Sequence, residues 1–313
     1  MKSLVSVITP CYNGADYLER FFDSIISQEY GSLQLIFVND GSTDSTLDIA
    51  RNYQCKFEER KIDFIILSQD NKGQASALNR GLKKAEGEFI LCMDSDDSLS
   101  ENYISEAVKY MENNPSTAYC HGSTCCFNDE GDVLERIEKR AAENEKDMFY
   151  DIIFHPQKVF FPGYVVRTEC FDKVIKDREI YTGKGGQNVQ ILLPLAWSYG
   201  EPAFIDSITY NYYIRSDSHS HSQTTTEKVI AQLVNYRKIL VETLKNISDS
   251  EFIKLINDIN IHYTKLCFGN SIDTKNPIFI EKYYNEMKSL KILTLKERLL
   301  KLKYCNFNRW VKQ

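Results

Sequence analysis

The sequence lacks a long hydrophobic run: no stretch approaches the roughly 18 consecutive apolar residues of a membrane-spanning helix. Its first apolar stretch, within MKSLVSVITPCYNG, spans only about seven residues before a proline, which is too short for the hydrophobic region of a signal peptide. Internal repeats and low-complexity segments are also missing. These absences argue against a membrane-spanning protein or a repeat architecture, and they predict a soluble chain.

The nine cysteines lack the spacing of a zinc site or of a disulfide framework. Their number is odd, no CxxC pair occurs, and Cys92 and Cys120 lie in apolar, strand-like runs. Such usage is typical of buried free thiols in a reducing compartment. We therefore expect a cytoplasmic protein.

Acidic residues outnumber basic ones over most of the chain. The formal net charge is -6, which argues against nucleic acid as a partner. Residues 282–313 are the exception, because they hold nine Lys or Arg against two acidic residues and so carry +7, leaving -13 for the remainder.

This basic segment also has an amphipathic pattern. Leucines recur near helical spacing, with an aromatic residue near the end: Leu290, Leu295, Leu299, Leu302 and Trp310. A basic amphipathic helix suits an anionic membrane surface, which predicts peripheral contact with the inner face of the plasma membrane. The alternative is a helix that packs its leucines on the domain, or on a sister subunit of a homo-oligomer, and exposes its lysines.

The first 120 residues alternate strand-like and helix-like patterns. The apolar, strand-like runs cover residues 3–10, 33–40, 62–69 and 88–94, and helix-like patterns cover 15–28, 46–54 and 73–87. Repeated units of this kind predict an α/β fold with a Rossmann-like, mostly parallel sheet and helices on both faces. Residues 120–222 are less regular, and residues 223–313 read as a C-terminal helical extension. We therefore expect a domain over 1–222, with halves 1–119 and 120–222, followed by a helical region over 223–313.

Each predicted strand is followed by a polar cluster: TPCYNG, NDGSTD, SQDNKGQ and DSDDS. In open parallel sheets, ligands bind where the carboxyl ends of the strands form a crevice. The last cluster places Asp94, Asp96 and Asp97 within four positions. Burying such like charge without a partner is unfavourable, whereas a hard divalent cation such as Mg²⁺ or Mn²⁺ makes it favourable. The alternative is a solvated turn in which Asp97 or Ser98 caps the next helix, and in either case we expect Ser100 or Ser98 to act as a cap.

Four motifs in this order and spacing, SVITPCYNG, LIFVNDGSTDST, NKGQASALNRGL and ILCMDSDD, closely resemble family 2 glycosyltransferases over roughly residues 3 to 220. The resemblance implies the A-type nucleotide-diphospho-sugar transferase fold (GT-A), with a nucleotide-binding half and an acceptor-binding half. It also implies Mn²⁺ or Mg²⁺, a nucleotide-sugar donor, with a UDP-sugar favoured, and inverting transfer to an acceptor hydroxyl.

The resemblance further implies roles for individual residues. Asp96 would bind the metal that bridges the two phosphates. The residues placed on the nucleotide-sugar are Thr9, Pro10, Tyr12, Asp40, Asn71, Lys72, Gly73, Asp94 and Ser95. Tyr12 suits stacking on the base and Asp40 suits hydrogen bonding to it. Packing within a turn for Tyr12, and an Asx-turn for Asp40, are the alternatives.

A late segment, YNYYIRSDSHSHSQ, matches the aromatic, basic and serine-rich stretch that folds over the diphosphate in the family. It offers Arg215 as a cation and His219 and His221 as metal ligands, since neutral imidazole suits Mn²⁺. The alternative is that both histidines are polar surface residues.

The sequence departs from the family where inverting members carry a Glu-Asp pair that supplies the catalytic base. Gln187 and Asn188 stand there, and neither amide takes up a proton at neutral pH. Three explanations are open. We favour a carboxylate from elsewhere as the base, such as Asp177 or Glu179. Alternatively, Gln187 and Asn188 only hold the acceptor while another group accepts the proton, or the chain is a weak catalyst. GKGGQN also suits a glycine-rich helix start.

These features predict a metal-dependent inverting glycosyltransferase that acts on a glycan, lipid-linked or glycoprotein acceptor in bacterial surface glycan synthesis. The alternative is a catalytically weak or non-catalytic sugar-nucleotide-binding subunit. A nucleotidyltransferase is disfavoured, because TPCYNGADY lacks a glycine-rich phosphate loop with Arg or Lys.

Overall fold

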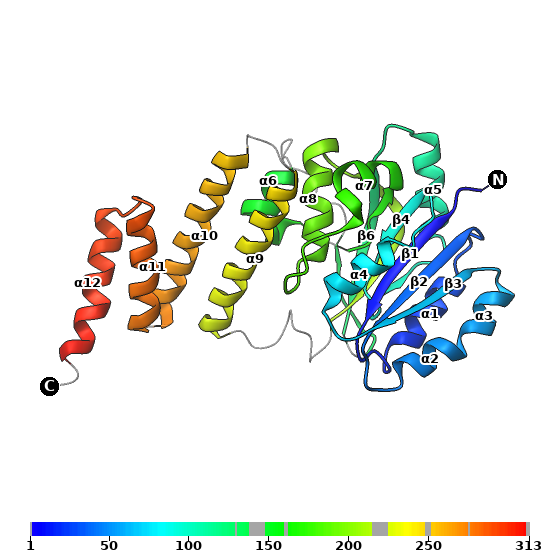
Figure 1. Cartoon of the computed structure of the whole chain (residues 1–313), viewed down its shortest axis with the longest axis horizontal. Helices are drawn as coiled ribbons and strands as arrows, with labels where there is room; N and C mark the ends of the chain where they lie inside the picture. The colour runs from blue at the N-terminus through cyan, green and yellow to red at the C-terminus, as the bar shows by residue number, and fades with distance from the viewer. Residues whose placement is uncertain are drawn as a thin grey trace. The chain divides into compact units, whose positions relative to one another are not determined.

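The computed structural model describes residues 2–128, 130–137, 148–159, 162–214, 225–247, 252–274 and 276–310, with side chains described as far as Tyr304. The chain forms two compact units, Met1–Ser218 and His219–Gln313, coloured blue to green and yellow to red in Figure 1. The expected boundary near residue 222 falls among residues 215–224, which lie outside the described residues.

Four parallel strands form one side of the sheet in the first unit. They are β1 (Val5–Cys11), β2 (Leu33–Asp40), β3 (Asp63–Gln69) and β4 (Phe89–Cys92), in the order β3-β2-β1-β4. The predicted strands and their parallel arrangement are confirmed. The apolar side chains of β1 and β2 are buried on both faces, and so are most of those of β4, which accounts for the nearly continuous hydrophobic runs in the sequence. β3 lies at the edge of the sheet, and most of its apolar side chains are only partly buried.

The sheet continues past β4 with antiparallel neighbours. β8 (Val165–Arg167) pairs with β4, and β6 (Tyr119–Phe127), β9 (Ala203–Tyr213) and β5 (Ser98–Leu99) follow in that order. β6 and β9 are parallel, and β7 (Val133–Ile137) pairs with β6. β4 therefore lies where the sheet changes direction.

Helices cover both faces of the sheet, as predicted. One face packs on α1 (Leu18–Ile26), α2 (Thr46–Asn52), α3 (Gln54–Glu59) and α5 (Tyr103–Asn113). The other face carries α4 (Gln74–Leu82), α7 (Thr168–Val174) and α8 (Gln187–Tyr199). Gly81 lets α4 approach closely, because a Cβ there would lie 2.4 Å from a methyl group of Ile8. The unit is completed by α6 (Met148–Phe154) and the short 3₁₀ helices Pro156–Lys158 and Lys176–Arg178.

The second unit is helical, in agreement with the predicted extension. It contains α9 (Thr226–Ile247), α10 (Phe252–Thr274), α11 (Pro277–Ser289) and α12 (Leu295–Trp310). Arg237 of α9 donates to Thr264 of α10 and pairs with Glu286 of α11, and this links three helices. Over the part of the chain that the structure describes, no helix is long and apolar enough to cross a bilayer.

Candidate functional site

The four polar clusters meet at one edge of the sheet, because the parallel strands end there together. Cys11 ends β1, Asp40 ends β2 and Gln69 ends β3, while residues 93–97 follow β4. This is also where β4 borders the antiparallel part of the sheet. The crevice position expected for a ligand site is therefore occupied by the predicted motifs.

Asp40 organises the loop that follows β3. Its Oδ1 atom accepts hydrogen bonds from the Lys72 N–H (2.9 Å) and the Gln69 side chain (2.8 Å), and its Oδ2 atom accepts from the Gly73 N–H (2.9 Å). The carboxylate is only 3% exposed. Asp40 thus holds Lys72 and Gly73 beside the end of β2, and its predicted contact with the base stays a prediction.

Glycines allow this close contact between loops. Gly41 has φ +74°, and a Cβ on it would lie 2.6 Å from the Asn71 backbone nitrogen. Gly73 has φ +89° and precedes the first residue of α4. Both positions require left-handed backbone, which glycine adopts without strain.

Asp94 and Asp96 are half-buried at the strand edge. The Gln74 side chain, at the start of α4, donates to Asp94 Oδ1 at 2.6 Å. Asp94 is thereby joined to the same loop and helix start that Asp40 holds. The structure thus places Asp94 in contact with Gln74, the residue that follows the 71–73 segment, and the predicted roles of these residues toward a nucleotide-sugar stay predictions.

Asp97 differs from its two neighbours because it is fully buried. Its carboxylate accepts from the Tyr210 hydroxyl (2.6 Å) and the Tyr213 N–H (3.1 Å), both on β9. Burial, followed by the charges of Asp96 and Asp94, raises the pKa of Asp97 well above its usual value, and the bonds from β9 oppose this. Of the three carboxylates, that of Asp97 therefore has a structural role inside the fold, and those of Asp94 and Asp96 lie at the edge of the sheet.

The prediction that Asp97, Ser98 or Ser100 caps the next helix is wrong, because the Ser100 hydroxyl accepts from the Thr209 N–H on β9. The N-cap of α5 is Asn102, and no side chain caps the helix there. Ser98 accepts from the Asn211 side chain instead.

Arg20, which sequence reasoning missed, lies against the acidic loop. Its Nη2 atom donates to the Asp96 backbone carbonyl at 2.6 Å, and its guanidinium carbon lies 3.4 Å from the centre of the Tyr213 ring. One cation on α1 thus joins the acidic loop to the end of β9. No local signal identifies it, because Arg20 occurs in an ordinary amphipathic helix 76 positions before Asp96.

Cys11 lies beneath the same loop. Burial raises the pKa of its thiol to about 12, with smaller contributions from the charges of Asp44 and Asp96 and an opposing hydrogen bond with Ser95. Ser95 is only 6% exposed, so its side chain supports the loop from the interior.

Thr9, Pro10 and Tyr12 are placed differently from one another. Thr9 and Pro10 are buried within β1, and Thr9 Oγ1 has no hydrogen-bond partner among the described residues. Tyr12 is 47% exposed and is the member of this set that presents a ring at the surface. The next residue, Asn13, donates through its N–H to the Ser42 hydroxyl (2.9 Å), which fixes the Tyr12 loop beside the end of β2.

The start of α8 also approaches the strand edge. Asn188 is half-buried and lines a narrow cavity of about 20 Å³ together with Cys92 and Tyr164. Gln187 is only 8% exposed, and its Nε2 atom has no partner among the described residues. Gly186 precedes the helix with left-handed backbone, in agreement with a glycine-rich helix start.

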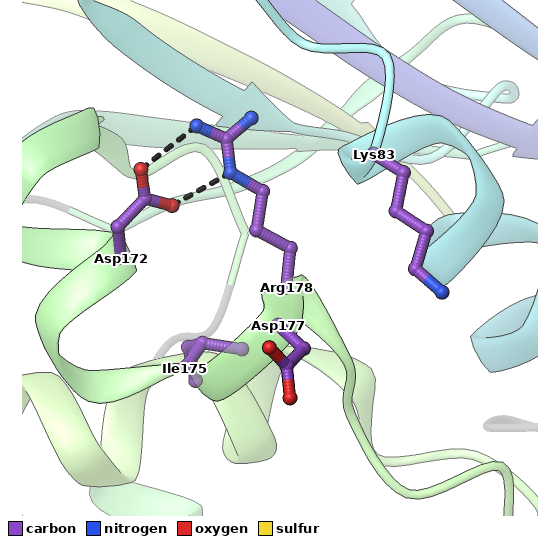
Figure 2. A pocket seen from close by; sticks show the side chains of 5 residues that line it. All are labelled: Lys83, Asp172, Ile175, Asp177 and Arg178. Carbon is purple, nitrogen blue, oxygen red and sulfur yellow. Dashed lines mark hydrogen bonds and ion pairs between the residues drawn. The ribbon is translucent and has the colours of Figure 1, made fainter.

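Asp177 and Glu179, the predicted alternatives for the catalytic base, lie near the C-terminal end of α4 and not beside Asp94. Glu179 forms an ion pair with Lys83, which follows the last residue of α4, whereas Gln74 at the first residue contacts Asp94. A nine-residue helix rises about 13 Å, so this placement does not favour Glu179 as the base. Figure 2 shows Asp177 in a surface pocket with Lys83 and Arg178, whose guanidinium faces Asp172.

The metal-binding prediction can be compared with the donor atoms present. Asp94 and Asp96 supply hard carboxylate oxygens at the edge, which suit Mg²⁺ or Mn²⁺ sharing its other positions with phosphate and water. Within the described ranges, no group of three or more His, Cys, Asp or Glu residues is arranged to hold an ion. His219 and His221 lie outside the described residues.

A sheet of this order, with acidic residues after β4 and antiparallel strands beyond it, defines the GT-A class of glycosyltransferase folds. The chain belongs to glycosyl transferase family 2, whose family model matches residues 6–182. The predicted family and fold are confirmed.

Relatives and solved structures agree with this membership. The putative teichuronic acid biosynthesis glycosyltransferase TuaG of Bacillus subtilis is 37% identical over 110 residues, which are 35% of this chain and 42% of that protein. The chain thus spans less than half of that relative. The structure of S. aureus TarS 1-349 in complex with UDP-GlcNAc has a TM-score of 0.55 at 17% identity, covering 97% of this chain and 92% of that one.

A mannosyltransferase from Pyrobaculum calidifontis, PcManGT, in complex with GDP-Man and Mn²⁺ also shares the fold. Its TM-score is 0.52 at 17% identity, with 98% of this chain and 81% of that chain covered. These structural neighbours bind different nucleotides.

Proposed function

We propose that this glycosyltransferase is a metal-dependent, inverting enzyme that transfers a sugar from a nucleotide-sugar, most simply a UDP-sugar, to an acceptor hydroxyl. The observation that carries the proposal is the division of the acidic cluster. Asp97 is held inside the fold by β9, which fixes Asp94 and Asp96 at the edge where the strand ends meet. The UDP-GlcNAc complex of TarS and the Mn²⁺ complex of PcManGT support this type of donor and metal.

We propose that Asp96 would hold Mn²⁺ or Mg²⁺, and that His219 or His221 would complete the site. The bound cation would supply positive charge to the diphosphate leaving group. Arg20 and the bonds to β9 keep the loop in place before any ligand arrives, so little reorganisation is required.

For the nucleotide, we propose that the exposed Tyr12 ring stacks on the base and that Asn71, Lys72 and Gly73 close over it. Asp40 fixes this loop through its three hydrogen bonds. Thr9 and Pro10 shape the floor from within β1, and Ser95 supports the loop of Asp94 and Asp96.

For the acceptor, we propose that Asn188 holds a hydroxyl and that Gln187 supports the start of α8. Because Glu179 is paired with Lys83 and Asp177 lines a different pocket, we assign the acceptor proton to Asp94. An acceptor hydroxyl that loses its proton to Asp94 attacks the anomeric carbon from the face opposite the diphosphate. The bond between that carbon and the diphosphate oxygen breaks, the nucleoside diphosphate leaves with the electron pair, and configuration inverts.

We propose that the acceptor is a glycan, lipid-linked or glycoprotein hydroxyl in bacterial surface polysaccharide synthesis, and that the reaction occurs in the cytoplasm. The name of TuaG, which refers to teichuronic acid biosynthesis, supports the first part. The cytoplasmic location is supported by the eight described cysteines, all of which are free.

Thermal unfolding with UDP, GDP and UDP-sugars, each with Mn²⁺ or with EDTA, tests this function. A ligand that binds only the folded state raises the melting temperature, so UDP is expected to stabilise the protein only with metal. Asp96→Asn should abolish this shift, whereas Asp94→Asn should keep it and lose sugar transfer.

Asp97→Asn is the matched control, because the Tyr210 hydroxyl can accept as well as donate a hydrogen bond. Asp97→Asn should keep both the rise in melting temperature caused by UDP with metal and the transfer of sugar. A UDP shift that is equal in EDTA, or that survives Asp96→Asn, would refute the metal site. Nucleotide binding by the wild type without donor hydrolysis or transfer would favour the non-catalytic alternative, which the absence of the Glu-Asp pair permits.

A further inference from the structure

Helix α12 exposes a stripe of three leucines. Leu295, Leu299 and Leu302 are 71%, 56% and 57% exposed. Their spacing places them within roughly 60° of one another around the helix, so they form one continuous apolar strip along about two turns. Large apolar side chains gathered in this way on a surface indicate an interaction site.

The residues that flank the leucine stripe are cationic. Lys296, Arg298 and Lys303 are exposed, and no exposed residue between positions 295 and 304 is acidic. Glu297 is half-buried and accepts from the Thr294 N–H at 3.0 Å, so its charge is used at the start of the helix. The stripe therefore has positive charge on both sides.

The opposite face of α12 is fixed to its own unit. Leu300 and Tyr304 pack against the core that contains Tyr283 and Met287. Lys301 pairs with Glu281 of α11 at 2.6 Å and lies 4.1 Å from the centre of the Tyr284 ring. The sequence-based alternative, in which the helix packs its leucines on the domain, is thus wrong for the three leucines of the stripe, and Leu300 is the one that packs.

We propose that the leucine stripe of α12 binds the surface of an anionic lipid membrane. The leucines enter the boundary of the acyl chains, and Lys296, Arg298 and Lys303 contact lipid phosphates. A second copy of this chain fits less well, because a two-fold contact through the stripe would set these cations against their own copies. The surface belongs to α12 alone and does not depend on the proposed catalytic site.

Co-sedimentation of the full chain with lipid vesicles tests the proposal. The wild type is expected to bind vesicles of phosphatidylcholine with one quarter phosphatidylglycerol, and to bind pure phosphatidylcholine much less. Leu295→Gln/Leu299→Gln/Leu302→Gln should weaken binding at least about tenfold, since the buried apolar area is removed. Lys296→Gln/Arg298→Gln/Lys303→Gln should remove the preference for the anionic vesicles.

The control variant is Ile253→Gln/Ile278→Gln, which changes two equally exposed apolar residues, 74% and 76%, on α10 and α11. It should bind like the wild type. Thermal unfolding should be unchanged in all variants, because the altered side chains are exposed. The proposal is overturned if the wild type does not bind anionic vesicles, if the leucine variant binds equally well, or if that variant only dissociates an oligomer detected by light scattering.

Discussion

At the scale of single residues, neighbouring carboxylates take different roles because their surroundings differ. Asp97 has two hydrogen-bond donors from β9 and no exposed surface, whereas Asp94 and Asp96 are half-buried at the edge. Arg20 adds a cation that touches the backbone of Asp96 rather than its carboxylate. This arrangement positions the loop through its backbone, while the carboxylate that we assign to the metal is that of Asp96.

Replacing Arg20 tests this positioning role. Arg20→Lys keeps the charge but loses the planar stacking on Tyr213 and the forked donor geometry. We expect Mn²⁺ affinity in the presence of UDP, measured by electron paramagnetic resonance, to fall roughly tenfold.

Arg51→Lys is the matched control for this substitution, because Arg51 is exposed and pairs with Asp48 on the same helix. It should leave Mn²⁺ affinity unchanged. Equal affinities in Arg20→Lys and the wild type would show that the guanidinium does not organise the loop.

At the scale of elements, the loop between β3 and α4 depends on the turn after β2. Asp40 holds the loop through its backbone N–H groups, and Gly41 lets it approach. The nucleotide pocket that we propose is therefore shaped by two segments about 30 positions apart.

Gly41→Ala should disturb both segments. The left-handed φ and the 2.6 Å approach to Asn71 both oppose a methyl group, so we expect the free energy of unfolding to fall by about 1–3 kcal/mol and UDP affinity to fall with it. Gly31→Ala is the control, because a methyl group there would meet open space and its backbone is not left-handed. Urea unfolding and calorimetric titration measure the two quantities; equal values for both variants would contradict this account.

The sequence was sufficient to predict β1 to β4 and the polar clusters, because buried parallel strands appear as apolar runs with polar ends. It did not reveal β9, since the pairing with β6 shifts register between Gly122 and Ser123, and the extra residues interrupt the alternation of β9. The partners of Asp97 were missed for that reason. Arg20 was missed because the contact joins α1 to a loop distant in sequence.

At the scale of the whole molecule, the chain divides into two compact units with separate cores. The core that contains Met287 is built only from residues of the second unit, and the core that contains Met111 only from the first. A substitution in the core of one unit should therefore destabilise that unit and leave the stability of the other unchanged.

Met287→Ala and Met111→Ala form a matched pair, since both side chains are fully buried. Each substitution should lower the free energy of unfolding of its own unit by about 2–5 kcal/mol. Hydrogen exchange should increase in α11 and α12 for Met287→Ala, with the UDP and Mn²⁺ shift retained, whereas Met111→Ala should increase exchange in β1 to β6. Faster exchange throughout the chain in both variants would contradict the division.

The order of the strands also has a consequence for how the chain matures. Val5 pairs with Phe89, and the carboxylate of Asp97 receives hydrogen bonds from Tyr210 and Tyr213 on β9. During synthesis, the ribosome must therefore release most of the first unit before the acidic loop has its final partners. Such distant pairings slow folding, so the nucleotide-sugar pocket that we propose is complete only after β9 has been synthesised.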